Sequence, residues 1–235
     1  LTLPFDERGY KLVYQRCCRN KTLLNIEAPL NTGMTLEVDI TAASLLNCNS
    51  GAVFGPFPPI YACVNTPITF NHSAVDLNND SLVYRLCAPL TGKDSASPAG
   101  KTDFPPYLEV VWRGSFSLSN LTNDLGLPGT VLSIDPKTGI ITGTPNIIGQ
   151  FLVGVCVDEY RAGKIISSTH RDFELNIVPC GTRPTASFTK STPACDGLRQ
   201  SFSNTSTQST NYEWYFDWNG NRNLKSTDQN PVFVY

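Results

Sequence analysis

Several features of familiar protein classes are scarce in this sequence of 235 residues. Histidine occurs twice and methionine once, and charged residues make up 16% of the chain, against roughly 25% in soluble proteins. The longest apolar stretch, residues 151–157, is far shorter than the roughly 20 residues of a membrane-spanning helix. We therefore expect no membrane insertion. The absence of an initiating Met and of a signal peptide predicts a mature chain or a piece of a longer protein.

The charge balance excludes one class of partner. Lys and Arg number 18 and Asp and Glu number 20, which gives a net charge of −2. Because nucleic acids and anionic membranes are held by a basic excess that releases counterions, we expect no nucleic-acid partner.

Motifs of catalysis are also missing. The sequence has no Gly-x-Ser-x-Gly and no glycine-rich phosphate loop. His72 and His170 are expected to be structural residues. No spacing marks a catalytic pair among the acidic residues considered, which are Glu109, Asp158, Glu159 and Asp172. The sequence therefore predicts a protein that is not an enzyme.

Cysteine, by contrast, is present in the chain, which contains eight. No Cys-x-x-Cys occurs and histidine is rare, so a zinc site is disfavoured. An even number of cysteines favours disulfides and an oxidising location, outside the cell or in a bacterial periplasm or surface. The expected disulfide cysteines are Cys17, Cys18, Cys48, Cys63, Cys87, Cys156, Cys180 and Cys195.

The spacing of the cysteines gives a hypothesis for their pairing, although eight cysteines allow 105 connectivities. Cys17 and Cys18 are adjacent and point to opposite faces of an extended strand, so we expect them to bond different partners. The hypothesis pairs Cys48 with Cys63 and Cys180 with Cys195, and it leaves Cys87 and Cys156 for the adjacent two.

Apolar residues alternate with a period of two in many short runs, for example over 82–86, 151–157, 173–177 and 212–216. Turn-forming residues separate these runs. This pattern predicts an all-β protein of antiparallel, disulfide-stapled sandwiches.

Proline-rich stretches at 54–59 and 178–184 predict the domain boundaries. We expect a partial N-terminal β module over 1–58 and a β-sandwich over 59–180 with a long insertion at 91–130. A third domain is expected over 181–235.

Two segments resemble known families. Residues 60–178 resemble a cadherin-like, immunoglobulin-type module of bacterial surface proteins. The matching patterns are F-x-x-x-A-x-D-x-N-x-D-S-L-x-Y at 70–84, L-x-I-D-x-x-T-G-x-I-x-G-T-P at 132–145 and G-x-F at 149–151. Residues 183–235 resemble a polycystic-kidney-disease (PKD) domain, through P-x-A-x-F at 184–188, F-x-N-x-S at 202–206, Y-x-W-x-F-D at 212–217 and N-P-x-F-x-Y at 230–235. In the PKD family a further strand follows, so we expect this domain to be truncated at its C-terminus.

The sequence YQRCCRN at 14–20 is similar to a segment of large secreted proteins of gliding Bacteroidetes-type bacteria, exported by the type IX system. Together the resemblances imply tandem immunoglobulin-like sandwiches in a large extracellular adhesin or filament. The implied partners are neighbouring domains of a longer chain, surface polysaccharide, or further copies in a filament. The alternatives are a carbohydrate- or protein-binding module and an accessory region of a secreted hydrolase.

Two loops have the oxygen-rich composition of calcium sites. In the first, oxygen side chains occupy positions 1, 3, 5, 7 and 12 of an EF-hand-like loop. These residues are Asp217, Asn219, Asn221, Asn223 and Asp228. Position 6 is Arg222, where the EF-hand has glycine. A hairpin turn that needs no metal also explains this composition.

The second loop contains Asp76, Asn78 and Asp80. The cadherin-like resemblance implies a calcium site here, with Asp158 of a later strand as a further ligand. An exposed turn stabilised by Asp and Asn side chains is the alternative.

The aromatic residues Trp214, Phe216 and Trp218 fall on one alternating face of the last domain. This face is expected to be the sandwich core, and a sugar-stacking strip is the alternative.

Overall fold

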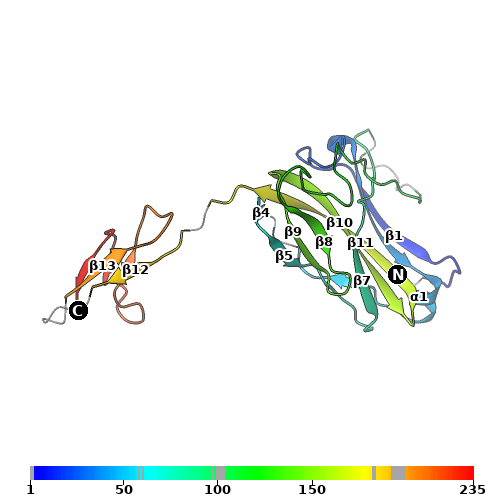
Figure 1. Cartoon of the computed structure of the whole chain (residues 1–235). Helices are drawn as coiled ribbons and strands as arrows, with labels where there is room; N and C mark the ends of the chain where they lie inside the picture. Colours follow the sequence, from blue (N-terminus) through cyan, green and yellow to red (C-terminus); the bar gives the residue numbers. More distant parts are fainter. Residues whose placement is uncertain are drawn as a thin grey trace. The chain divides into compact units, whose positions relative to one another are not determined.

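The computed structural model describes residues 3–57, 59, 61–96, 98, 104–181, 184–191 and 199–235. Strands account for 44% of the chain and helices for 4%, so the expected all-β class is confirmed. The chain divides into two compact units, which are described separately below: unit 1, Leu1–Pro179, and unit 2, Cys180–Tyr235 (Figure 1). The division falls inside the predicted boundary at 178–184.

The expected separate module over 1–58 is wrong, because this segment is part of unit 1. Strand β1 (Tyr10–Arg16) pairs with β2 (Met34–Ile40), and β2 pairs with β11 (Lys164–Val178). The chain then forms the short helix α1 (Ala42–Leu46).

The proline-rich stretch does not end a domain, since β3 (Val53–Phe54) pairs antiparallel with β6 (Ala74–Val75) on its other side. A three-residue 3-10 helix, Pro29–Asn31, lies between β1 and β2.

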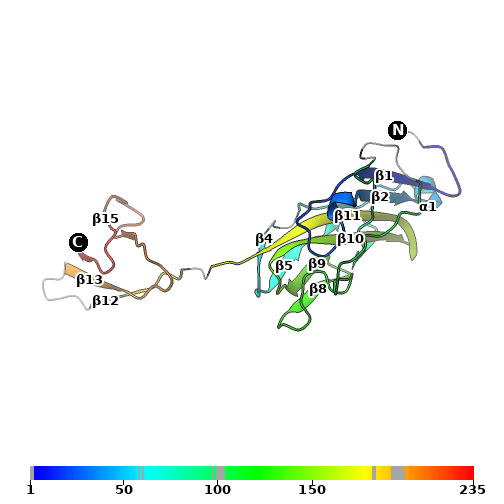
Figure 2. The same ribbon diagram turned by 90° about the horizontal axis from the view of Figure 1, so that it is seen from above.

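The main sheet of unit 1 has the strand order β1-β2-β11-β10-β7. Its centre is a long antiparallel hairpin of β10 (Gly149–Arg161) and β11, which Figure 2 shows crossing the unit. Strand β7 (Ser81–Leu86) pairs antiparallel with β10. Strand β4 (Tyr61–Cys63) pairs with the end of β11, in parallel orientation.

A second sheet packs against the main one. It has the order β5-β9-β8, from β5 (Ile68–Asn71), β9 (Ile140–Thr144) and β8 (Thr130–Ile134). Apolar side chains that alternate along β10 and β11 meet those of β8 and β9, as a period of two requires. The buried residues of this core are Leu121, Leu132, Ile141, Phe151, Val153, Val155, Phe173, Leu175 and Ile177.

The opposite face of β10 is also covered. Leu152 packs in a second cluster with Leu23, Ile26 and Val110, which come from segments outside the strands. Asn25 is fully buried, donates to the Leu152 carbonyl at 2.9 Å and accepts from the Leu152 N–H at 2.9 Å. Burial on two faces explains the continuous apolar sequence of this strand.

Unit 2 contains a sheet of three strands, β12 (Phe188–Lys190), β13 (Arg199–Asn204) and β16 (Val232–Val234), in the order β12-β13-β16. A short hairpin joins β14 (Trp214–Tyr215) to β15 (Lys225–Ser226). Phe202 and Pro231 are buried in its described part.

Candidate functional site

Three carboxylates form a cluster in unit 1, which we call the carboxylate cluster: Asp76, Asp80 and Glu159. One oxygen of each lies within 4.8 Å of the others. The turn between β6 and β7 supplies both aspartates, and β10 supplies Glu159. Pairing of β10 with β7 places Glu159 opposite Leu82, next to that turn.

The local bonds of the turn leave one carboxylate oxygen unused. Asp76 Oδ1 accepts the N–H groups of Asn78 at 2.9 Å and of Asp80 at 2.7 Å. Asp76 Oδ2 is buried and has no hydrogen-bond partner in the described part of the chain. The side chain of Asn78 accepts from the Ser50 N–H at 2.7 Å, so Asn78 bonds another segment of the chain.

Glu159 is 1% exposed and accepts from the Asn49 side chain at 2.6 Å and from the Ala52 N–H. Burial raises the pKa of Glu159. The hydrogen bonds from Asn49 and Ala52 oppose this shift, and the negative charges of Asp76 and Asp80 add to it.

Arg161 donates to Asp80 at 2.6 Å and lowers the pKa of that aspartate. With all groups ionised, three carboxylates and one guanidinium leave two negative charges in the cluster. Two negative charges on oxygen ligands are the complement of a hard divalent cation such as Ca²⁺.

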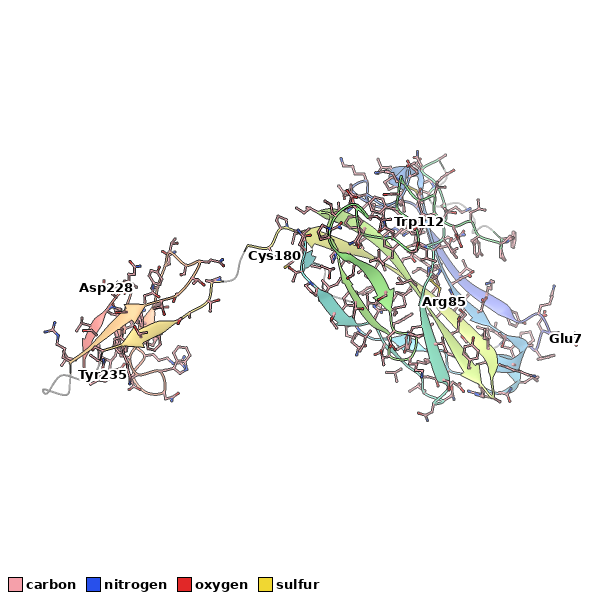
Figure 3. All side chains as sticks on the ribbon, in the orientation of Figure 1. Glu7, Arg85, Trp112, Cys180, Asp228 and Tyr235 are labelled. Carbon is pink, nitrogen blue, oxygen red and sulfur yellow. A yellow bond between two sulfur atoms is a disulfide. The ribbon has the colours of Figure 1, made fainter. Side chains whose placement is uncertain are left out.

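The expectation that Asp158 belongs to this site is wrong. Adjacent residues of a strand point to opposite faces, and Asp158 lies on the face of β10 away from the cluster. It bonds Arg85 Nε at 3.2 Å and Ser168 Oγ at 2.6 Å. Arg85 projects from β7 in Figure 3. Glu159, the next residue, occupies the position that the resemblance implied for Asp158.

The loop at 217–228 forms hydrogen bonds within itself. The Asp217 carboxylate accepts the N–H groups of Gly220 at 2.9 Å and Asn221 at 3.0 Å. Asn221 Oδ1 accepts the Asn223 N–H at 3.0 Å, and Asp228 accepts from Ser226 Oγ at 3.1 Å. These contacts are those of the hairpin-turn alternative.

The disulfides differ from the proposed pairing. Cys17 bonds Cys18, and Cys87 bonds Cys156 with 5.8 Å between their Cα atoms. Cys87 follows β7 directly, and the register of β7 on β10 places Leu86 opposite Val155, which brings these two cysteines together.

The other four cysteines bear on the rest of the pairing hypothesis. Cys48 is an exposed free thiol, so its pairing with Cys63 is wrong. Cys63 and Cys180 are each disulfide-bonded. Cys195 lies outside the described residues.

A buried ionic network lies on the main sheet and was not predicted. Arg19 donates from Nη2 to Asp172 at 2.8 Å and from Nε to the Gly33 carbonyl at 2.9 Å. His170 Nε2 lies 2.8 Å from the other oxygen of Asp172. These three side chains are at most 7% exposed. Since 153 residues separate Arg19 from Asp172 in sequence, no local pattern points to the pair.

His72 is 1% exposed among aromatic rings, with the Phe54 and Phe173 centroids each 5.1 Å from its own. Neither of its nitrogens has a hydrogen-bond partner in the described structure. Burial, with a contribution from the positive charge of Arg171, lowers the pKa of His72 from 6.5 to about 4. The neutral imidazole is therefore the form that the fold accommodates.

Stability is expected to fall in acid because of His72. The unfolded chain takes up this proton near pH 6.5, whereas the folded chain resists protonation until about pH 4. The folded state therefore gains its full stabilisation from neutral His72 above pH 6.5. The free energy of unfolding falls by about 3 kcal/mol as the pH falls to 4. Urea unfolding at a series of pH values checks this. His72→Phe should remove that part of the pH dependence, and an unchanged slope between pH 6.5 and 4 would show that His72 is not its source.

The expected aromatic face of unit 2 is divided between two sides. Trp214 contacts Phe202 with centroids 5.8 Å apart, and Phe216 contacts Phe202 at 5.6 Å. Trp218 instead contacts Tyr215, at 5.2 Å, and is 57% exposed. Trp218 therefore does not share the core face.

Comparison with protein-family models, curated proteins and solved structures finds no match to this chain. Within the described residues, no helix has the length and apolar character needed to cross a membrane.

Proposed function

We propose that this chain is a non-catalytic segment of a large extracellular surface protein, an adhesin or filament, in which it acts as a spacer and interaction module. In this proposal the β-sandwich is immunoglobulin-like. The observation behind the proposal is the Cys87–Cys156 disulfide, which joins the chain after β7 to the central strand β10. Such a bond persists in oxidising surroundings and is rare in the cytosol.

The buried ionisable groups favour a structural role over catalysis. Arg19 pairs with Asp172 inside unit 1, His170 Nε2 lies 2.8 Å from the same carboxylate, and His72 is enclosed by aromatic rings. A catalytic group must reach a substrate at hydrogen-bond distance, and these side chains are buried.

Protease treatment of intact cells of the source organism tests the surface location. An antibody against unit 1 should detect loss of the chain while a cytosolic marker protein stays whole. Retention of the chain until the cells are lysed would contradict the proposal.

We also propose that the carboxylate cluster binds Ca²⁺. The supporting observations are the three oxygens within 4.8 Å, the two net negative charges and the buried, unpartnered Oδ2 of Asp76. A cation there would tie the β6–β7 turn to β10, and through Glu159 to the Asn49–Ala52 segment.

Calcium is expected to stabilise unit 1 modestly. At about 2 mM Ca²⁺, a dissociation constant of roughly 10⁻⁴ to 10⁻³ M gives about 0.6 to 1.8 kcal/mol. Thermal unfolding with Ca²⁺ and with a chelator measures this difference. Asp76→Asn combined with Glu159→Gln should abolish it, and Asp158→Asn is the matched control that should retain it. Equal melting temperatures of the unaltered chain in both buffers would refute the site.

A further inference from the structure

Unit 2 contains an open hollow of about 660 Å³, which we call the aromatic hollow. Its walls come from the segment before β12, from β12 and β13, from the segment between β13 and β14, and from the start of the β14–β15 hairpin. Sites for small molecules usually measure about 300 to 1,000 Å³ and combine apolar walls with a few polar groups. The size therefore suits one or two sugar rings of a larger ligand.

Aromatic side chains line the hollow and are held in fixed orientations. Trp214 donates from Nε1 to the Asp228 carbonyl at 2.8 Å, and its ring lies 5.4 Å from that of Phe188, which is 55% exposed. The hydroxyl of Tyr212 donates to the Ser209 carbonyl at 2.8 Å.

Trp218 is the most accessible of the indole rings in the hollow. The guanidinium of Arg222 lies over the Trp218 ring, 4.2 Å from its centroid. An edge-to-face contact with the Tyr215 ring fixes the orientation of the indole. With 57% of the residue exposed, a ring surface remains open to a ligand. Rigid aromatic surfaces bind apolar faces at low entropic cost.

Hydroxyl and amide groups alternate with these rings. The polar lining includes Asn204, Ser206, Ser209 and Asn211. The hydroxyls of Ser206 and Ser209 already bond Ser187 and the Asn211 carbonyl. An apolar β-strand seated in the hollow would instead cover the amide side chains of Asn204 and Asn211, which is costly when they are buried. A carbohydrate presents C–H faces for the rings and hydroxyls for the amides, so it satisfies both.

The charge of the lining disfavours anionic ligands. No lysine or arginine occurs among the lining residues of the described structure. The charged residue present is Glu213, whose carboxylate lies 3.2 Å from Lys225 Nζ. The nearby cations are already engaged, since Lys225 pairs with Glu213 and Arg222 stacks on Trp218. A phosphorylated or sulfated ligand would therefore meet the Glu213 carboxylate, whereas neutral hydroxyls can donate to it.

We propose that the aromatic hollow binds a neutral polysaccharide, with a sugar ring stacked on Trp218 and hydroxyls bonded to Glu213. This inference deepens the interaction part of the proposed function and rests on it. It names the class of ligand, a neutral glycan.

Affinity electrophoresis of the full chain tests the proposal, in gels that contain soluble β-glucan, mannan, xylan or dextran. We expect at least one polysaccharide to retard the unaltered chain. Trp218→Ala should weaken that retardation about tenfold, as loss of an aromatic stacking contact predicts. Phe104→Ala removes an aromatic side chain that is 91% exposed in unit 1 and is the matched control with full retardation. Circular dichroism of Trp218→Ala should match that of the unaltered chain.

Three results would overturn the proposal: no retardation with any of the four polysaccharides, equal retardation of Trp218→Ala, or loss of retardation in Phe104→Ala as well. A further arm measures tryptophan fluorescence with a synthetic peptide of alternating valine and threonine. Binding of this peptide without binding of polysaccharide would assign the hollow to a β-strand. A chain that is removed by protease from intact cells but binds no glycan would retain the surface role and lose only this site.

Discussion

Replacing Arg19 with alanine is expected to destabilise unit 1 by about 3 to 5 kcal/mol, because removal of one partner leaves a buried charge unpaired. Asp172 has a side chain that is 2% exposed, and it would retain its negative charge beside His170 alone. The Gly33 carbonyl would lose the Arg19 donor as well, and the Leu90 carbonyl would keep the Thr35 N–H but lose Arg19. Urea unfolding at neutral pH measures the loss.

Two further variants test whether the loss comes from leaving a buried charge unpaired rather than from losing an ion pair as such. Arg8 pairs with Asp6 at 2.8 Å on the surface, so Arg8→Ala should leave the unfolding midpoint unchanged. Arg19→Met combined with Asp172→Leu removes both charges and should recover much of the lost stability. A midpoint for Arg19→Ala equal to that of the unaltered chain would contradict the buried network.

Removal of the Cys87–Cys156 disulfide is the second large expected effect. The bond joins residues separated by 69 positions. Closing a loop of this length lowers the conformational entropy of the unfolded chain, which stabilises the folded state by about 4 kcal/mol. Cys87→Ala combined with Cys156→Ala should therefore cost about 4 kcal/mol in the free energy of unfolding. Denaturant unfolding in oxidising buffer, with Cys48→Ser in every variant to prevent exchange, measures this cost.

The vicinal disulfide provides the matched control. Cys17 and Cys18 are adjacent in sequence, so their bond closes a minimal loop and restricts the unfolded chain far less. Cys17→Ser combined with Cys18→Ser should shift stability much less than the Cys87 and Cys156 double variant. Equal losses in the two variants would mean that loop closure is not the source of the effect.

Local patterns were sufficient to predict several of the strands but not their partners. Alternation at 151–157 and 173–177 is found in β10 and β11, and the proline-rich segment at 178–184 contains the division between the units. Strand β2 pairs with β11 over three residue pairs, and no pattern in the sequence of either strand indicates this pairing. For this reason residues 1–58 were expected to form a separate module.

The candidate sites show the same limit. The turn with Asp76 and Asp80 was recognisable from its composition, but the partner on β10 depended on which face each side chain takes. Both faces of β10 are buried, so apolar alternation could not distinguish Asp158 from Glu159. The Arg19–Asp172 pair depends wholly on tertiary folding, since no short-range pattern relates residues so far apart.

Stretching single molecules of the full chain, with and without a dithiol reductant, tests the central claim that unit 1 is a disulfide-locked spacer. With the disulfide intact, the 69 positions between Cys87 and Cys156 cannot extend. Because Cys63 and Cys180 are disulfide-bonded as well, the measurement uses a chain with Cys63→Ser and Cys180→Ser. Reduction should then lengthen the fully unfolded chain by about 230 Å, at roughly 3.3 to 3.6 Å per residue. An equal contour length in both buffers would show that the disulfide does not form in the native chain, and would contradict the account.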